Sequence, residues 1–191
     1  MKKLLLLSLA TCFAGLVQAK PVQYTIDPGH TYPSFEGDHM GGVSVWRGKI
    51  NHNTGAVMLD REEGFGVVEV NIDLSSIDFG HDHLNKWAQG KDFFDLEKFP
   101  NASYKGKLTS FVNGAPTEAK GELTLHGVTK PLNLKINSFK CIQHPIYKRE
   151  LCGADASAVF QRDQFGLTAG QSWGFNMDVT LRIQVEAIKN D

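Results

Sequence analysis

Residues 175–187 read FNMDVTLRIQVEA, with an apolar residue at every odd position and a polar residue at every even one. A period of two places the two sets on opposite faces of a β-strand, whereas a helix would scatter both around its axis. A strand of this length spans roughly 40 Å, about twice the usual length, and such a strand coils with its sheet. Because closure removes the exposed edges of a coiled sheet, the stretch predicts an antiparallel β-barrel.

Shorter segments with the same pattern precede this strand and are separated by turn residues. The clearest is a hairpin, in which residues 122–126 and 132–137 alternate on either side of a turn at 127–131. The other expected strands lie at residues 22–27, 43–50, 56–60, 68–74, 102–108 and 154–160. Together they predict a mainly β fold, an extended antiparallel barrel of about eight strands.

One segment departs from the β pattern. Leu84, Trp87 and Ala88 fall at helical spacing within residues 83–90, with Asp82 available to cap the start and Gly90 to end the helix. An aromatic segment follows at residues 93–100. We expect one short helix and this segment to lie across one mouth of the barrel.

The N-terminus has the features of a cleavable signal peptide. Lys2 and Lys3 precede an apolar run at residues 4–17, and the small-residue site Val17-Gln18-Ala19 follows it. The sequence therefore predicts a signal peptide at residues 1–19 and a single domain at residues 20–191. We expect export to the periplasm or secretion.

Export bears on the cysteines, because disulfides persist in oxidising compartments. Cys12 lies within the expected signal peptide, and Cys141 and Cys152 remain as a pair. We expect a disulfide that closes a short hairpin loop and contributes about 3 kcal/mol. The alternative is a two-cysteine metal or redox site, but the spacing matches neither a CxxC motif nor a zinc knuckle.

Charge and motifs argue against several functional classes. The formal net charge is −1, and without Lys2 and Lys3 it is −3, so no nucleic-acid partner is expected. Neither a GxSxG elbow, an HExxH motif nor a glycine-rich phosphate loop occurs. The histidines considered as metal ligands are His30, His39, His81 and His83, and their spacing matches no familiar zinc site. We expect neither catalysis nor a bound metal.

A stripe of small residues indicates space inside the barrel. Ala154, Ala156 and Ala158 share the inward face of one expected strand. Small side chains on this face leave an apolar void that suits an apolar ligand. The alternative is that large neighbouring side chains or a helix fill the space.

The chain resembles the YceI-like polyisoprenoid-binding proteins along nearly all of residues 20–191. The most specific match is the run GELTLHGVTKP at residues 121–131, which carries the predicted hairpin. The other matching residues occur in the same order in both: Tyr24–Asp27, Gly29–Thr31, Phe35, His39, Gly41–Gly42, Ser76–Asp78, Asp92–Asp95, Phe99–Pro100, Arg162 and Phe165–Gly166.

The resemblance implies a lipocalin-like barrel that holds a long isoprenoid chain, such as a prenyl quinone or prenyl pyrophosphate, in an apolar tunnel. It implies no cofactor other than this lipid. The side chains expected to line the tunnel are Phe35, His39, Phe93, Phe94, Phe99, Ala154, Ala156, Ala158, Phe160, Phe165, Trp173, Phe175 and Met177.

One departure from the family pattern bears on the head group of this lipid. Many members carry a His-Leu-Arg-Ser-like run before the Asp-Phe-Phe-Asp motif, whereas this chain has WAQG at residues 87–90. Because that Arg and His are missing, we expect a neutral head such as a quinone. The alternative function is a metal- or cofactor-dependent enzyme that acts on a quinone-like substrate on the same barrel. Transient contact with the inner membrane and a monomeric or homodimeric state stay open.

Overall fold

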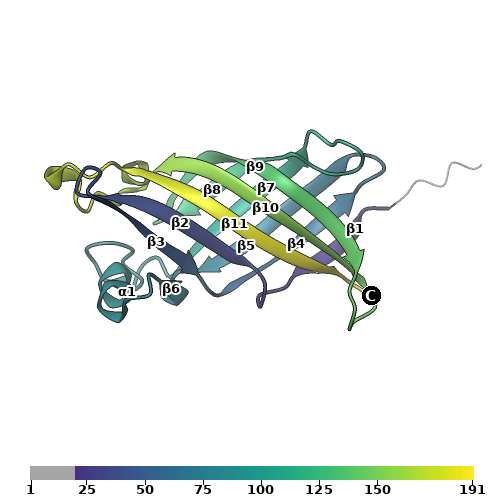
Figure 1. Ribbon diagram of the computed structural model, residues 1–191, viewed down its shortest axis with the longest axis horizontal. Helices are drawn as coiled ribbons and strands as arrows, with labels where there is room; N and C mark the ends of the chain where they lie inside the picture. The colour runs from purple at the N-terminus through teal and green to yellow at the C-terminus, as the bar shows by residue number, and fades with distance from the viewer. Residues whose placement is uncertain (1–19) are drawn as a thin grey trace, which may run out of the picture.

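The computed structural model describes residues 20–191, which form a closed antiparallel β-barrel (Figure 1). The last strand of the barrel closes on the first, with Ile26 opposite Ala187. The predicted mainly β barrel is therefore confirmed, whereas the predicted signal peptide lies outside the described residues. In pairing order the eight strands are β1 (Val22–Ile26), β4 (Asn53–Asp60), β5 (Phe65–Asp73), β7 (Asn101–Thr109), β8 (Glu118–Leu125), β9 (Val128–Gln143), β10 (Glu150–Gln161) and β11 (Asp178–Lys189).

Three further strands extend the barrel at one end. β2 (Tyr32–His39) pairs with the first half of β11, so β1 and β2 share one edge of that strand. β3 (Ser44–Ile50) pairs with β2, and β6 (Ile77–Asp78) pairs with β3. The sheet order ends at β6 on this side, so the barrel wall opens between β6 and β7.

The short helix α1 (Asp82–Gln89) lies at this opening, in agreement with the predicted helix at the mouth (Figure 1). His81, rather than Asp82, caps the helix, because its Nδ1 accepts a hydrogen bond from a first-turn backbone N–H at 3.3 Å. Asn85 ties the helix to the chain after β6, since its Oδ1 accepts a hydrogen bond from the Phe79 N–H at 2.8 Å. The helix therefore holds a fixed place beside the open end.

The bounds of the last strand differ from the prediction. β11 begins at Asp178, three residues later than expected, so Phe175 and Met177 lie before the strand. The connection from β10 contains two 3-10 turns, η2 (Arg162–Phe165) and η3 (Gln171–Trp173). Gly170 and Gly174 flank η3 with φ values of 81° and 78°, a conformation that ends any extended run.

Two other strands also differ from the prediction, β2 and β9. β2 was not predicted, because Pro33 and Gly37 lie within it and both are disfavoured in strands. β9 has 16 residues and is longer than β11, which has 12. The remaining short element, η1 (Leu74–Ser76), separates β5 from β6.

Candidate ligand-binding cavity

A long cavity of about 740 Å³ runs through the barrel interior. β11 contributes the odd-numbered residues of the alternating stretch to its wall: Val179, Leu181, Ile183, Val185 and Ala187. From the first to the last of these the strand rises roughly 27 Å, or roughly 20 Å along the axis of a barrel with ordinary strand tilt. A sphere of 740 Å³ would be only about 11 Å across, so the cavity is elongated along the strands.

The predicted alanine stripe lies only partly on this wall. Ala154 and Ala156 line the cavity opposite Val185 and Ile183 of β11. A register shift against β9 follows Asp155, so that Ala154 pairs with Phe139 and Ala156 with Ile136, and both partners also line the cavity. Ala158 does not line the cavity and packs against the main core cluster instead.

The structure separates the thirteen predicted lining residues into two groups. Nine of them lie on the cavity wall: Phe35, His39, Phe93, Phe94, Ala154, Ala156, Phe160, Trp173 and Phe175. Phe165 is 2% exposed and Met177 is also buried, because both pack into the protein outside the cavity. Phe99 packs on the His126 ring at 4.4 Å, beside the hairpin turn between β8 and β9. Ligand contact by any of the thirteen stays a prediction.

Aromatic rings gather at the open end of the cavity. The three tryptophans of the chain, Trp46, Trp87 and Trp173, all line the cavity and are all partly exposed. The His39 ring stacks on Trp46 at 4.2 Å and meets the Phe175 ring edge-on at 5.0 Å. The sequence-based prediction included Trp173 but missed Trp46 and Trp87 as lining residues. Trp87 lies on the helix predicted at the mouth, and Trp46 lies on β3, which reaches the mouth by pairing with the unpredicted β2.

Arg162 is the cation on the cavity wall near this end, and sequence reasoning gave it no role at the mouth. It is 9% exposed and donates hydrogen bonds of 2.6 Å to the Leu167 and Ala169 carbonyl oxygens. Burial lowers the pKa of its guanidinium, and the negative charges of Asp163 and Asp38 oppose that shift. The guanidinium is thus held by backbone carbonyls and partly balanced by two carboxylates.

Asp38 fixes the β2–β3 turn to the segment before β11. Its carboxylate accepts hydrogen bonds from the N–H groups of Asn176 at 2.9 Å, Gly42 at 2.6 Å and Gly41 at 2.9 Å. These bonds, with that of Asn176 first, lower the pKa of the Asp38 carboxyl. Two loops distant in sequence are therefore joined at the mouth by one charged side chain.

Replacing Asp38 by Asn is expected to make the protein less stable at neutral pH but less sensitive to acid. Because the folded-state pKa is lowered, the carboxylate stabilises the protein fully above the unfolded value of about 3.9 and loses this effect as pH falls through the folded value. Thermal melts of both proteins between pH 7 and 2 measure the effect. Parallel melting curves across the whole range would contradict this role.

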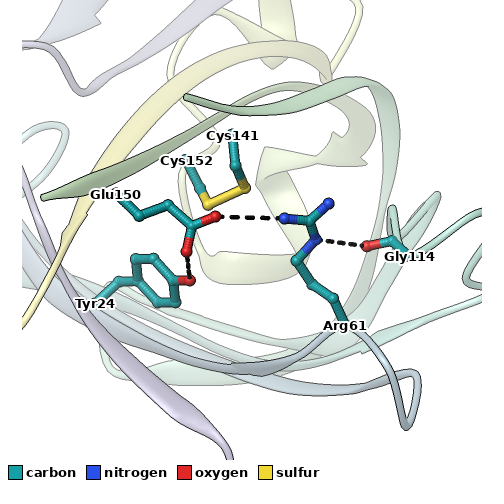
Figure 2. Close-up of a disulfide and its surroundings, with 6 residues drawn as sticks. All are labelled: Tyr24, Arg61, Gly114, Cys141, Glu150 and Cys152. Atoms are coloured by element: carbon teal, nitrogen blue, oxygen red, sulfur yellow. Dashed lines mark hydrogen bonds and ion pairs between the residues drawn. A yellow bond between two sulfur atoms is a disulfide. The ribbon is translucent and has the colours of Figure 1, made fainter. Parts of the chain in front are cut away.

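A polar cluster lies beside the disulfide at the other end of the barrel (Figure 2). Glu150 lies between Tyr24 and Arg61: it accepts a hydrogen bond from the Tyr24 hydroxyl at 2.7 Å and forms an ion pair with the Arg61 Nη1 at 3.4 Å. Burial, followed by the bond to Glu150, raises the pKa of Tyr24. Arg61 also donates to the Gly114 carbonyl at 3.3 Å, which ties the β4–β5 turn to the loop after β7.

The disulfide joins Cys141 of β9 to Cys152 of β10, which are direct cross-strand partners, with Cα atoms 4.0 Å apart. The predicted pairing is confirmed, and Cys152 also lines the cavity. The bond encloses the turn of the β9–β10 hairpin, with a sequence separation of 11 residues.

Replacing both cysteines by serine is expected to lower the free energy of unfolding by about 3 kcal/mol, because the unfolded chain gains loop entropy. Urea melts of the variant and of the reduced wild type should agree. Thiol titration of denatured, unreduced wild-type protein should give no free thiol. A titre of two thiols per chain would contradict the disulfide.

Polar groups within the cavity wall are mostly satisfied by the protein itself. The Tyr104 hydroxyl lies within hydrogen-bonding distance of two carbonyl oxygens, that of Ala119 at 3.2 Å and that of Leu132 at 3.1 Å, and can donate to either. Burial raises the pKa of Tyr104 to about 12, so the phenol stays neutral. Thr31 Oγ1 accepts a hydrogen bond from the Glu186 N–H at 3.2 Å. The interior therefore suits a ligand with few polar atoms.

The candidate metal ligands do not meet in the cavity. Within residues 20–191, two clusters bring three potential ligand side chains together. One contains Cys141 and Cys152, which are already bonded to each other, and the other joins Asp27, His30 and Glu186. In the latter, His30 is exposed and its Nδ1 lies 2.8 Å from an Asp27 oxygen. His39 lines the cavity but belongs to neither cluster.

Within the part of the chain that the structure describes, no helix is long and apolar enough to cross a membrane.

The fold and the cavity together define an antiparallel β-barrel with an elongated apolar interior. The YceI-like domain model matches residues 24–187, and the chain belongs to this family. A UPF0312 protein of Vibrio cholerae serotype O1 is 27% identical over 191 residues, covering 98% of each chain.

Two solved structures share the fold. The YCEI protein of Campylobacter jejuni superposes with a TM-score of 0.66 at 21% identity, over 78% of this chain and 88% of that one. A domain from Saccharophagus degradans, described as polyisoprenoid binding and implicated in plant cell wall breakdown, gives a TM-score of 0.63 at 14% identity. That match covers 88% of this chain and 99% of the domain.

Proposed function

We propose that the protein is an exported carrier that binds a long isoprenoid chain, such as that of a prenyl quinone, inside the barrel. The observation that carries the proposal is the elongated apolar cavity of about 740 Å³, open at the end where three tryptophans gather. An extended hydrocarbon chain fits a long, narrow apolar space, whereas a compact polar metabolite would leave its polar atoms unpaired there.

The mouth favours a weakly polar, uncharged head group. Arg162 is the cation on the cavity wall, but its guanidinium already donates to two carbonyl oxygens and has Asp38 and Asp163 nearby. Asp92 also lines the cavity. A pyrophosphate would bring strong negative charge toward these carboxylates, whereas a quinone carbonyl needs only one hydrogen-bond donor.

Two features support export as part of the proposal. The signal-peptide pattern at residues 1–19 predicts translocation, and the Cys141–Cys152 disulfide suits an oxidising compartment such as the periplasm. The comparisons add support for the ligand class, since one related fold is described as a polyisoprenoid binding domain.

Mass spectrometry of an organic extract tests the proposal most directly. Protein purified from a periplasmic fraction, without detergent, should release an isoprenoid lipid at close to one molecule per chain. Recovery of the processed protein in that fraction tests export separately. An extract without lipid, together with no binding of added prenyl quinone, would rule the carrier function out.

Competition between a prenyl quinone and a prenyl pyrophosphate of equal chain length tests the head group. We expect the quinone to bind about tenfold or more tightly, because the acidic side chains at the mouth oppose the pyrophosphate. Tighter binding of the pyrophosphate would reverse this assignment while leaving the chain-binding cavity in place.

A further inference from the structure

Exposed apolar side chains surround the open end of the cavity. We define the mouth rim as the following residues: Met40, Val43, Val45, Trp46, Trp87 and Trp173. Val43 is 76% exposed and Trp173 is 73% exposed. A contiguous exposed apolar patch, unlike a single exposed residue, is typical of an interaction surface. The rim therefore presents apolar surface to solvent at the place where a ligand enters.

Within the rim, contacts join the β2–β3 hairpin to the segment before β11. Gly41, in the β2–β3 turn, approaches Gly174 so closely that a Cβ there would lie 3.1 Å from the Gly174 carbonyl oxygen. The Trp173 and Phe175 rings are 6.3 Å apart, and Phe175 in turn contacts His39 beside Trp46. Figure 1 shows the β2–β3 hairpin and the segment before β11 reaching the same end of the barrel.

We infer that the mouth rim docks on the surface of a zwitterionic phospholipid bilayer. Its composition fits this partner, because tryptophan and aliphatic side chains together are typical of segments that lie in the membrane interface. Its position fits too, since the rim is continuous with the apolar cavity wall through Trp46, Trp87 and Trp173. The inference rests on the proposed function in one respect: a carrier of an apolar chain must collect it from a lipid phase.

The charges point to a zwitterionic rather than an anionic surface. The Arg47 side chain on the hairpin is already paired with Glu36 at 3.2 Å, and Asp38 is held by three backbone N–H groups. The chain without Lys2 and Lys3 carries a formal charge of −3, which disfavours an anionic bilayer. Docking should therefore depend on apolar burial and change little with salt.

Tryptophan fluorescence provides a direct test, because all the tryptophans of the chain lie in the rim. Phosphatidylcholine vesicles with brominated acyl chains should quench the emission of the wild-type protein, and the protein should float with the vesicles in a density gradient. Both signals should be similar at low and high salt. Flotation only with anionic vesicles, or no flotation, would overturn the inference.

Two charge substitutions of matched exposure locate the docking surface. Val43 and Ile146 are both 76% exposed and neither lines the cavity, but Ile146 lies in the β9–β10 hairpin turn. Val43→Glu should weaken vesicle binding about tenfold or more, whereas Ile146→Glu should leave it unchanged. Equal effects of the two would contradict docking through the rim.

Two further measurements separate docking from ligand binding and from self-association. Binding of a short, soluble prenyl quinone should be equal in wild type and Val43→Glu, so a failure of ligand binding and a failure of docking give different results. In sedimentation experiments without vesicles, we expect the wild type to form no dimer that is lost in the Val43→Glu variant. A rim-dependent dimer that does not float with vesicles would show that the rim pairs with a second copy instead.

Discussion

Replacing Ala156 by phenylalanine is expected to weaken binding of long isoprenoid chains strongly while leaving the stability of the ligand-free protein close to that of the wild type. Ala156 lies on the cavity wall between Ile136 and Ile183, so the larger ring would occupy space that an extended chain needs. We expect affinity for a long prenyl quinone to fall about 100-fold. Because the ring enters an apolar void, the free energy of unfolding should change by less than about 1 kcal/mol.

Two variants on the same strand serve as controls. Val159→Phe adds bulk at an exposed position and should leave both binding and stability unchanged. Ala158→Phe adds bulk against the core cluster, away from the cavity, and should cost roughly 1–3 kcal/mol through overpacking. Urea melts of delipidated protein and a chain-length series of ligands measure both quantities. A strongly destabilised Ala156→Phe protein that still binds long chains would show that the cavity is not the binding site.

Replacing Gly121 by alanine is expected to destabilise the barrel by at least about 3 kcal/mol. A Cβ at this position would lie 2.2 Å from the Lys105 carbonyl oxygen and 2.7 Å from the Gly106 Cα, both in the neighbouring strand. Gly106 and Gly121 are cross-strand partners, and the Tyr104 side chain lies against both. Since the contacts are with backbone, the strands must move apart to relieve them.

Substitutions at two other glycines test whether the close approach of the neighbouring strand sets the cost. At Gly106 the nearest atoms to a new Cβ belong to the Tyr104 side chain at 2.9 Å, so Gly106→Ala should cost less, about 1–2 kcal/mol. At Gly37 nothing lies within 4 Å, so Gly37→Ala should change stability by less than about 0.5 kcal/mol. In urea melts, the loss in free energy of unfolding should therefore be largest for Gly121→Ala, smaller for Gly106→Ala and smallest for Gly37→Ala. Similar losses for all three would show that loss of glycine, rather than the close approach, sets the cost.

The sequence was sufficient to predict the barrel because its long strands alternate cleanly. The residues from Val179 to Ala187 place every apolar side chain on the cavity side, as the period of two requires. Periodicity carried no signal for β2, where Pro33 and Gly37 replace the expected β-branched residues. The periodicity also led to the wrong prediction that Phe175 and Met177 belong to β11. The alternation continues by chance through this segment, although glycine turns precede the strand.

The cavity could be predicted only where a residue's face follows from its strand. Ala154 and Ala156 were identified in this way, whereas Ala158, two residues further on, packs against the core cluster and does not line the cavity. The mouth depends on contacts between segments distant in sequence. The bond from Asn176 to Asp38 and the contact between the Phe175 and His39 rings follow from the tertiary fold and have no local pattern.

The polar cluster at the end of the barrel opposite the mouth has a consequence for how a bound lipid would travel. Tyr24, Glu150 and Arg61 are linked there beside the disulfide, so we expect a chain in the cavity to enter and leave through the mouth. A tube open at both ends would act as a conduit between two membranes, passing molecules in single file. A barrel with one opening must instead leave the donor membrane and present the same end to the acceptor membrane. The lipid then leaves the cavity with its head group first. Delivery would then be limited by how often the particle changes partners, and not by flow along a bridge.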